Sequence, residues 1–313
     1  MNDKCETVTN NTAPSLKKKS TAIKTGGNLF CVLMLLPVIY NFLVFYCGVN
    51  IGSIALAFSV PTPDGGEVYS LDNFKNFIKE LSRTDSAVYM ALFNTLEYYL
   101  LGLVKFALTS IVAYFFYKKV YFHKIYKIIF FLPSMVPGMV YISVFKNFIG
   151  TYGPLYKFIY ELFGVKMQPL MANPETAEVV IMFYAFWSGF GAQLLIQIGA
   201  MNRIPEDVIE AATLDGCLGF KEFWFIVMPL IFETIATYFL LGIVGIFQAS
   251  GPFLFFVGET MPQVYTLSYW IFTQAMGGAT NYPAAIGLIF TIIALPLVIV
   301  SRWGINKVDT VTY

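Results

Sequence analysis

The chain has 313 residues, of which 57% are hydrophobic, 18% aromatic and only 12% charged. A soluble domain carries about twice that share of charged residues, so the composition predicts an integral membrane protein. The net charge of +1 excludes the basic surplus expected of a nucleic-acid-binding protein. One histidine, His123, and four cysteines without a CxxC pair argue against a metal site, and no cofactor is predicted.

The N-terminal region combines a polar stretch with a long apolar run. Residues 1–27 are predicted to form a cytoplasmic tail. No charged residue occurs from 25 to 63, and this run is far longer than the apolar part of a signal peptide, which has about 7–15 residues. We therefore expect a retained spanning helix over 28–57. Cys31 and Cys47 would lie about 24 Å apart along that helix, too far for a disulfide.

Five further segments are apolar over the roughly 20 residues that a spanning helix needs. Polar stretches bearing proline or glycine separate them. We therefore predict an all-α membrane protein with six transmembrane helices in a single domain over 28–305, followed by a cytoplasmic tail over 306–313. The predicted spans are 28–57, 87–117, 125–147, 178–201, 223–248 and 283–302.

Lysine and arginine set the expected orientation. With the N-terminus inside, thirteen of these residues face the cytoplasm and six face outward, and such a bias favours both termini in the cytoplasm. The outer loops are then 58–86, 148–177 and 249–282. The second has apolar residues at near-helical spacing and is expected to lie along the membrane surface. The third is aromatic and broken by glycine and proline, which favours an interfacial or re-entrant hairpin.

The loop between the fourth and fifth spans contains a predicted short helix. Pro205 suits a first helical turn and Gly216 suits a stop, which gives about eleven residues. A helix of this length is marginal in water, so it must pack against something. Ala211 and Ala212 leave a low surface for close approach. Asp215 places a negative charge at the unfavourable end of the helix, so we expect it to have a basic or N–H partner.

The same loop carries a spaced pattern that resembles the EAA signature of binding-protein-dependent ABC importer permeases. The pattern starts with Glu210-Ala211-Ala212. Three residues separate it from Gly216, nine more separate Gly216 from Ile226, and one separates Ile226 from Met228-Pro229. Methionine stands where the usual form has leucine before the final proline. The residues of the pattern are Glu210, Ala211, Ala212, Gly216, Ile226, Met228 and Pro229.

Three other stretches resemble the carbohydrate-uptake branch of this family, which includes maltose- and glycerol-phosphate-type permeases. They are "NTL" at 94–96, "FFLPSMVPGMV" at 130–140, and the approach from "WSGF" at 187–190 to "IPEDVIEAA". Asp215 also precedes the glycine, as it tends to in the family. The resemblance covers 28–305.

The resemblance implies a type I ABC importer permease fold with a core at about 88–303 and a coupling helix at about 204–216. In such permeases the coupling helix docks on a cytoplasmic ATPase dimer and transmits its motion to the spans. The other implied partners are a second homologous permease chain, forming a heterodimer, and an extracellular substrate-binding lipoprotein. The residues implied in ATPase coupling are Glu210, Ala211, Ala212, Asp215 and Gly216.

The implied cargo is a mono- or oligosaccharide, or a related polyol, moved by alternating access across a bacterial plasma membrane. The abundance of tyrosine and phenylalanine further suggests a Gram-positive source. The chain has no Gly-Lys dipeptide and hence no nucleotide-binding P-loop, so ATP hydrolysis requires another polypeptide. With one histidine, no Ser/His/Asp set is plausible, and we predict neither catalytic residues nor an enzyme.

An ion-coupled secondary transporter is the alternative. Such proteins place buried acids near broken helices in inverted repeats. Glu97 and Glu233 are acids within predicted spans, and Pro133 and Pro137 are expected to break the third span. However, the sequence shows no inverted repeat, and the EAA pattern would then have no role.

Two charges within the predicted spans are expected to pair. Lys105 lies about twelve residues from the inner end of the second span and Glu233 about ten from the inner end of the fifth, which places both roughly 15–18 Å deep. A charge at that depth is costly and is usually paired or functional. We expect an ion pair between the two helices; the alternative is that each faces a water-filled cavity separately.

Sugars are bound by aromatic faces together with amide and hydroxyl groups. The fourth span and the start of the last outer loop offer a candidate substrate path made of Tyr184, Trp187, Gln193 and Gln248. Helix packing by the aromatics and interhelical hydrogen bonding by the amides is the alternative for each of them.

Overall fold

The computed structural model describes residues 20–62, 66–164, 168–247, 256 and 261–307, with backbone alone for 20–29. The chain divides into two compact units, Met1–Ala55 and Leu56–Tyr313. The single membrane domain over 28–305 that the sequence predicts stays a prediction. Gln248 lies outside the described residues.

The first unit is helical. Helix α1 (Ser20–Asn41) runs into a π-helical stretch, η1 (Phe42–Gly48), and then into α2 (Val49–Phe58), whose last turn belongs to the second unit. Together they provide an apolar candidate span over Phe30–Phe58, as predicted. Nearly all of its side chains are exposed and apolar, which suits contact with lipid because a helix satisfies its own backbone hydrogen bonds.

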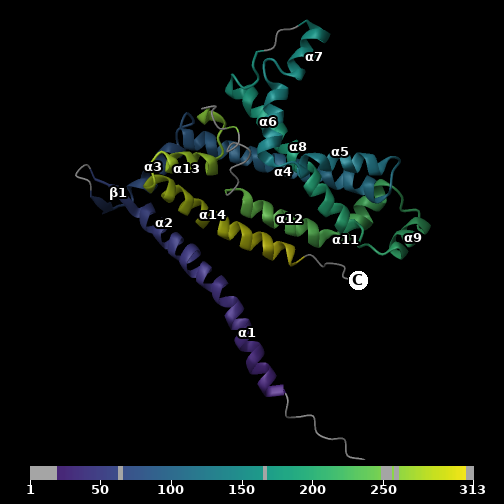
Figure 1. Ribbon diagram of the computed structural model, residues 1–313, viewed down its shortest axis with the longest axis horizontal. Helices are drawn as coiled ribbons and strands as arrows, with labels where there is room; N and C mark the ends of the chain where they lie inside the picture. Colours follow the sequence, from purple (N-terminus) through teal and green to yellow (C-terminus); the bar gives the residue numbers. More distant parts are fainter. Residues whose placement is uncertain (1–19, 63–65, 165–167, 248–255, 257–260, 308–313) are drawn as a thin grey trace, which may run out of the picture. The chain divides into compact units, whose positions relative to one another are not determined.

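Three long unbroken helices form the frame of the second unit, and all three were predicted as spans. They are α4 (Ala87–Tyr117), α8 (Pro174–Met201) and α14 (Asn281–Ile305). The Ser86 hydroxyl caps α4 by accepting from the Tyr89 N–H, and Pro174 occupies the first turn of α8. Helix α8 packs along α4 and α5, and α14 packs along α12 (Figure 1).

The predicted span over 125–147 is not a straight helix. Helix α5 (His123–Met135) ends before Pro137, and α6 (Gly138–Ile149) with α7 (Pro154–Phe163) continues at an angle of 104°. The residue before a proline is forced out of the helical region, and Val136 is extended (φ −81°, ψ 134°). Pro137 therefore makes the break, whereas Pro133 lies inside α5.

The predicted span over 223–248 is also bent, by 71°. Its first part consists of α10 (Phe220–Glu222), a π-helical turn η2 (Phe223–Val227) and α11 (Met228–Leu230). Ile231 leaves the helical region (φ −96°, ψ 11°), and α12 (Phe232–Gly245) follows. If each bent pair is one span, the described residues hold six candidate spans, the predicted number.

Polar side chains organise one end of the second unit, where β1 (Ser59–Pro61) and β2 (Glu67–Tyr69) form an antiparallel hairpin before α3 (Asp72–Leu81). The Asn73 amide donates to the carbonyls of Ala57 and Ser59 at 3.0 and 2.9 Å, and Asn281 donates to the same Ser59 carbonyl at 3.0 Å. The Tyr282 hydroxyl donates to Glu80 at 2.8 Å. These bonds tie the hairpin and α3 to α14.

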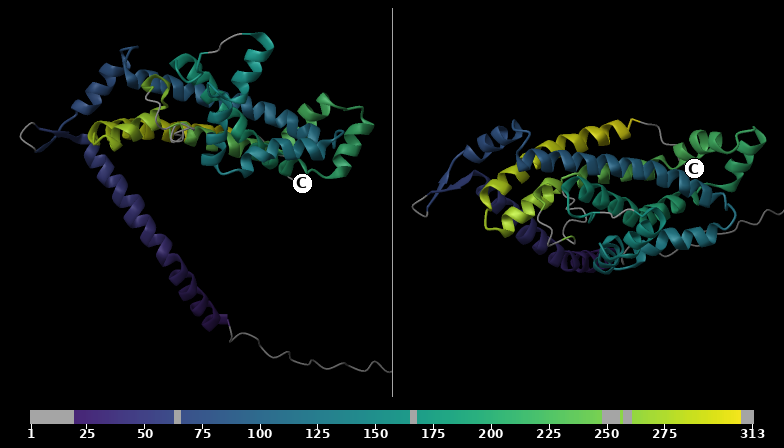
Figure 2. Two further views of the ribbon diagram at one scale, coloured as in Figure 1. Left: turned by 45° about the horizontal axis from the view of Figure 1, so that its top comes forward. Right: turned by 90° about the horizontal axis from the view of Figure 1, so that it is seen from above.

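In the last predicted outer loop, the described part from residue 261 onward lies beside α4. A 3₁₀ turn, η4 (Pro262–Val264), precedes α13 (Leu267–Met276), which packs on α4. The Asn94 amide donates to the carbonyls of Gln263 and Tyr265 at 2.7 and 3.1 Å. The short helix α9 (Glu206–Leu214) lies at the opposite end of this unit from β1, α3 and α13 (Figures 1 and 2). The sides of the membrane on which the α9 loop and the last outer loop lie stay a prediction.

Candidate functional site

Helix α9 forms where the sequence predicts a short helix, with nine residues instead of about eleven. Pro205 is the N-terminal cap and Asp215 the C-terminal cap. Two acidic residues, Glu206 and Asp207, occupy the first turn, where they favour the positive end of the helix dipole. Gly216 follows with φ +75°, the left-handed conformation that glycine adopts readily at the end of a helix.

The two faces of α9 differ. Val208 and Ile209 are half-buried and Ala212 is buried, so this face packs on the rest of the unit. Ala211 is exposed, and Leu214 leaves 89% of its surface uncovered. Of the two alanines expected to meet a partner, only Ala211 is therefore on the outward face.

The outward face and the end of α9 are acidic. No ion pair among the described side chains includes Glu206, Asp207, Glu210 or Asp215, so that part of the chain offers Asp215 no basic partner. Glu206 and Glu210 stand four residues apart on the helix, a spacing at which like charges repel. The acids are Glu206, Asp207, Glu210 and Asp215, all exposed.

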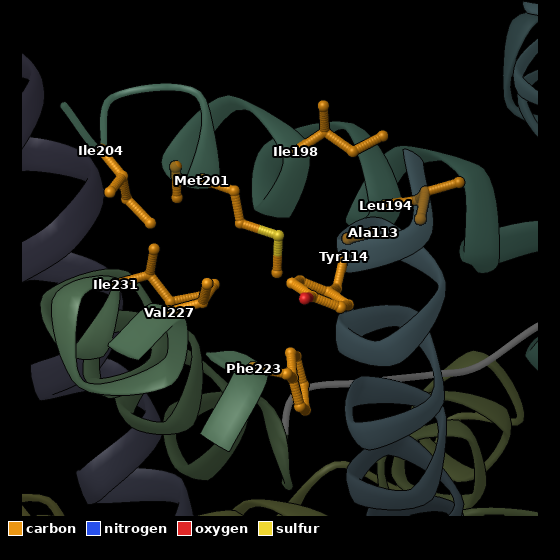
Figure 3. Packing of buried hydrophobic residues seen from close by; sticks show 10 residues of the cluster. Ala113, Tyr114, Leu194, Ile198, Met201, Ile204, Phe223, Val227 and Ile231 are labelled. Carbon is orange, nitrogen blue, oxygen red and sulfur yellow. The ribbon is translucent and has the colours of Figure 1, made fainter. Parts of the chain in front are cut away.

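Behind α9, a buried apolar cluster joins three parts of the second unit (Figure 3). Met201 and the Tyr114 ring point toward one another in its centre, with Phe223 beside them (Figure 3). The ring centroids of Tyr114 and Phe223 lie 5.2 Å apart. Because Val208 and Ile209 pack against the same cluster, α9 rests on side chains from α4, α8 and η2. The cluster consists of Ala113, Tyr114, Leu194, Ile198, Ala200, Met201, Ile204, Phe223, Val227 and Ile231.

A cavity of about 660 Å³ lies between α4, α8 and α12. This volume is within the range of small-molecule sites, which is about 300–1,000 Å³. Its wall is mostly apolar, and Lys105 is the one charged residue among the described residues that line it. Its polar lining residues are Thr95, Tyr98, Tyr99, Lys105, Gln193, Tyr238 and Thr266.

The sequence predicts an ion pair between Lys105 and Glu233, but no ion pair among the described residues joins them. The Lys105 ammonium donates to the Ala185 carbonyl of α8 at 3.5 Å, and it lies so close to Gly189 that a Cβ there would be 2.7 Å from it. Glu233 is exposed in the first turn of α12. The depth of Glu233 was counted along a straight helix, and the bend at Ile231 invalidates that count.

The predicted substrate path is divided. Gln193 lines the cavity, but the Tyr184 ring is buried among other rings, 5.1 Å from that of Phe145. The Trp187 ring lies 6.2 Å from the Phe130 ring, and neither Tyr184 nor Trp187 lines the cavity.

Sequence reasoning missed the tyrosines that α4 and α12 contribute to the cavity, Tyr98, Tyr99 and Tyr238. Helical spacing from Lys105 is the signal that could have found the first two. Residues at intervals of three or four share a helix face, and Tyr98, Gly102 and Lys105 follow that interval.

The sequence of residues 105–310 matches the model of a protein family described as the binding-protein-dependent transport system inner membrane component. The chain belongs to this family. The matched residues include the C-terminal part of α4, all of α8 and α9, and the cluster behind α9. The family is a transport component of the inner membrane, which agrees with the helices long and apolar enough to span a membrane.

Two curated relatives are sugar permeases by name. The galactooligosaccharides transport system permease protein GanP of Bacillus subtilis is 26% identical over 191 residues, which is 58% of this chain and 45% of GanP. The maltose/maltodextrin permease protein MalF of Klebsiella aerogenes is 31% identical over 110 residues, 35% of this chain and 21% of MalF. The chain thus matches less than half the length of either relative. Because these relatives include a Gram-negative protein, they do not support the predicted Gram-positive source.

Solved structures share the fold of this family member. A chain of a bacterial ABC transporter involved in the import of the acidic polysaccharide alginate superposes with a TM-score of 0.76 at 21% identity, covering 92% of this chain and 98% of that one. A structure of a bacterial alginate ABC transporter with an alginate-pentasaccharide-bound periplasmic protein gives a TM-score of 0.73 at 21% identity, with 91% and 96% covered. The predicted ABC importer permease fold is confirmed.

Proposed function

We propose that this chain is the transmembrane permease subunit of an ATP-driven ABC importer for a sugar, and that α9 is its coupling helix. The observation that carries the proposal is the asymmetry of α9: one face is buried on a core shared by α4, α8 and η2, while the other is exposed and acidic. Because α9 is packed on this core, a displacement of α9 by a bound partner can be transmitted to the spanning helices.

The partner of α9 is an ATPase subunit with a basic and apolar groove. Glu206 and Glu210 stand four residues apart and repel one another. A basic groove on the partner would offset this repulsion by attracting both carboxylates. Leu214 is almost fully exposed, and such an apolar side chain gains free energy when a pocket covers it. Glu210 supplies charge, Ala211 permits close approach, and Leu214 fills the pocket.

The cargo is a mono- or oligosaccharide or related polyol. GanP and MalF are named for oligosaccharides, and tyrosine, threonine and glutamine in the cavity offer the ring faces and hydrogen-bonding groups that sugars require. An outer binding protein delivers the sugar, and a second homologous permease completes the path. ATP binding and hydrolysis in two cytoplasmic subunits then switch it between outward and inward access. The subunit itself performs no enzymatic reaction.

This assignment places α9 and both chain ends in the cytoplasm of a bacterium, with β1, α3 and α13 on the outer side. Lys118 and Lys119 at the end of α4 fit this orientation, since cytoplasmic loops are enriched in basic residues. Nothing in the family, relatives or fold supports the alternative of an ion-coupled secondary transporter.

The test uses the complete importer in nanodiscs. A binding screen on its extracellular receptor first identifies the sugar. Glu210→Lys is then expected to reduce stimulation of ATP hydrolysis by sugar-loaded receptor by about tenfold or more, because it reverses the charge at the centre of the docking face. The protein should still reach the membrane at the normal level, since Glu210 is exposed.

Glu161→Lys is the matched control. Glu161 is an exposed acid on α7, so the same charge reversal is made on a different helix. Full sugar-stimulated hydrolysis in the Glu210 variant would refute the assignment of α9, and an importer that never responds to any receptor-bound sugar would refute the assignment of function.

A further inference from the structure

A buried ion pair lies directly behind α9. Glu222, in the short helix α10, has no exposed side-chain surface, and its carboxylate lies 2.7 Å from the ammonium of Lys118, which is 35% exposed. Lys118 is the residue that follows α4. The pair therefore joins the end of a spanning helix to the segment through which the chain leaves α9.

A second set of contacts supports the same junction. The Tyr114 hydroxyl donates to the Gly219 carbonyl at 2.9 Å. Tyr114 precedes Lys118 by four residues, which places both on one face of α4. The Tyr114 ring packs beside that of Phe223 (Figure 3). Tyr114 and Lys118 thus contact Gly219, Glu222 and Phe223 through a hydrogen bond, an ion pair and ring packing.

The segment between α9 and α10 contains two glycines with left-handed backbone conformation. Gly216 and Gly219 both have positive φ, +75° and +62°, and glycine adopts such angles without the steric penalty of a side chain. The backbone between α9 and α10 therefore has two positions of high conformational freedom. Glu222, which follows these glycines, is held by its ion pair with Lys118.

A pair of apolar residues would fill this site at least as well, because burying two charges costs much of what their attraction returns. In some proteins a buried charged pair is retained because it selects one geometry, and this pair holds α10 to the end of α4.

We propose that Lys118 and Glu222 are positioning residues for ATPase coupling: they fix the exit of α9 to the end of α4, so that a displacement of α9 moves α4. Helix α4 lines the cavity with Thr95, Tyr98, Gly102 and Lys105. The pair thereby connects the docking surface to the path of the cargo. This inference rests on the proposed function of α9.

Glu222 is buried and Lys118 is partly exposed, so removing one charge is expected to have a different effect from removing the other. In Glu222→Gln, a neutral side chain of the same shape replaces the buried carboxylate, and Lys118 can turn its ammonium to water. In Lys118→Met, the buried carboxylate loses its counter-charge, so this variant is expected to accumulate poorly. The double variant Lys118→Met/Glu222→Met removes both charges and keeps an apolar fill, so it is expected to fold.

The experiment follows α4 directly. In a chain whose native cysteines are replaced by serine, Gly102→Cys introduces a thiol on the cavity wall, at a position where a Cβ meets no atom within 4 Å. The complete importer in nanodiscs is labelled with a small maleimide, with and without Mg-ATP and vanadate. Co-purification of the ATPase is recorded in parallel as a measure of docking by α9.

In the parent, nucleotide is expected to change the labelling rate by about fivefold or more. In Glu222→Gln and in the double variant, the ATPase should still co-purify, but the response should fall below about twofold. Lys118→Arg keeps the pair, and Lys119→Met removes a neighbouring lysine that no ion pair of the described residues includes; both variants should respond as the parent does.

A full nucleotide response in both Glu222→Gln and the double variant would overturn the inference and leave the pair with a structural role only. A parent that retains no ATPase would overturn the proposed function, and this inference with it. The two failures are distinguished by the co-purification measurement.

Discussion

Replacing Gly191 by alanine is expected to destabilise the chain, whereas the same change at Gly199 in the same helix is not. Helix α5 crosses α8 at Gly191, and a Cβ there would lie 2.2 Å from the Phe130 carbonyl oxygen and 3.0 Å from the Cα of Phe131. Both are backbone atoms, so no side-chain rotation relieves the overlap. The Phe130 carbonyl would have to retreat by more than about 1 Å, and overpacking of this kind costs about 1–3 kcal/mol.

Two glycines of α8 serve as controls. A Cβ at Gly199 meets nothing within 4 Å, so alanine there should stabilise the helix by up to about 1 kcal/mol through its higher propensity. A Cβ at Gly189 would meet only the end of the Lys105 side chain, which can move aside at small cost. Thermal unfolding in detergent, followed by size-exclusion after heating, should rank Gly199→Ala highest and Gly191→Ala lowest. Equal stability of Gly191→Ala and Gly199→Ala would refute the close packing of α5 on α8.

Two further predictions concern the ends of the second unit. Asn94→Leu removes the amide that donates to Gln263 and Tyr265 and should cost about 1–3 kcal/mol; faster hydrogen exchange in α13 would report it, and unchanged exchange would contradict it. Gly216→Val should loosen α9 by about 1 kcal/mol or more, because β-branched residues resist positive φ, whereas Gly216→Asn should be tolerated. Faster trypsin cleavage after Lys221 in the valine variant alone is the expected result, and equal cleavage of both variants would count against it.

Much of the helical frame could be predicted from local chemistry. The bounds of α4 follow from an apolar run with Ser86 as its cap. Helix α8 begins four residues before the predicted span because Pro174 and Glu175 suit a first helical turn, although hydropathy alone excludes them. Helix α9 was predictable for the same kind of reason, since its start and stop residues are local signals.

The bends and the cavity depend on tertiary geometry that hydropathy does not contain. Pro137 and Pro229 each predict a break nearby, but the sequence contains neither the angle of 104° at the first nor that of 71° at Ile231. The expected Lys105–Glu233 pair failed because depth was counted along straight helices. Gln193 was identified by residue type, and helical spacing from Lys105 could have added Tyr98, but Tyr238 belongs to the site only because of how α12 faces the cavity.

The most direct test of the central claim is the sidedness of α9. Leu214→Cys, in a chain with its four cysteines replaced by serine, is labelled with a membrane-impermeant maleimide, and Tyr69→Cys on β2 serves as the outer control. The account predicts that the Leu214 variant is labelled only in inside-out vesicles, more slowly when the ATPase is bound, and that the Tyr69 variant is labelled only in intact cells. Labelling of the Leu214 variant in intact cells would contradict it.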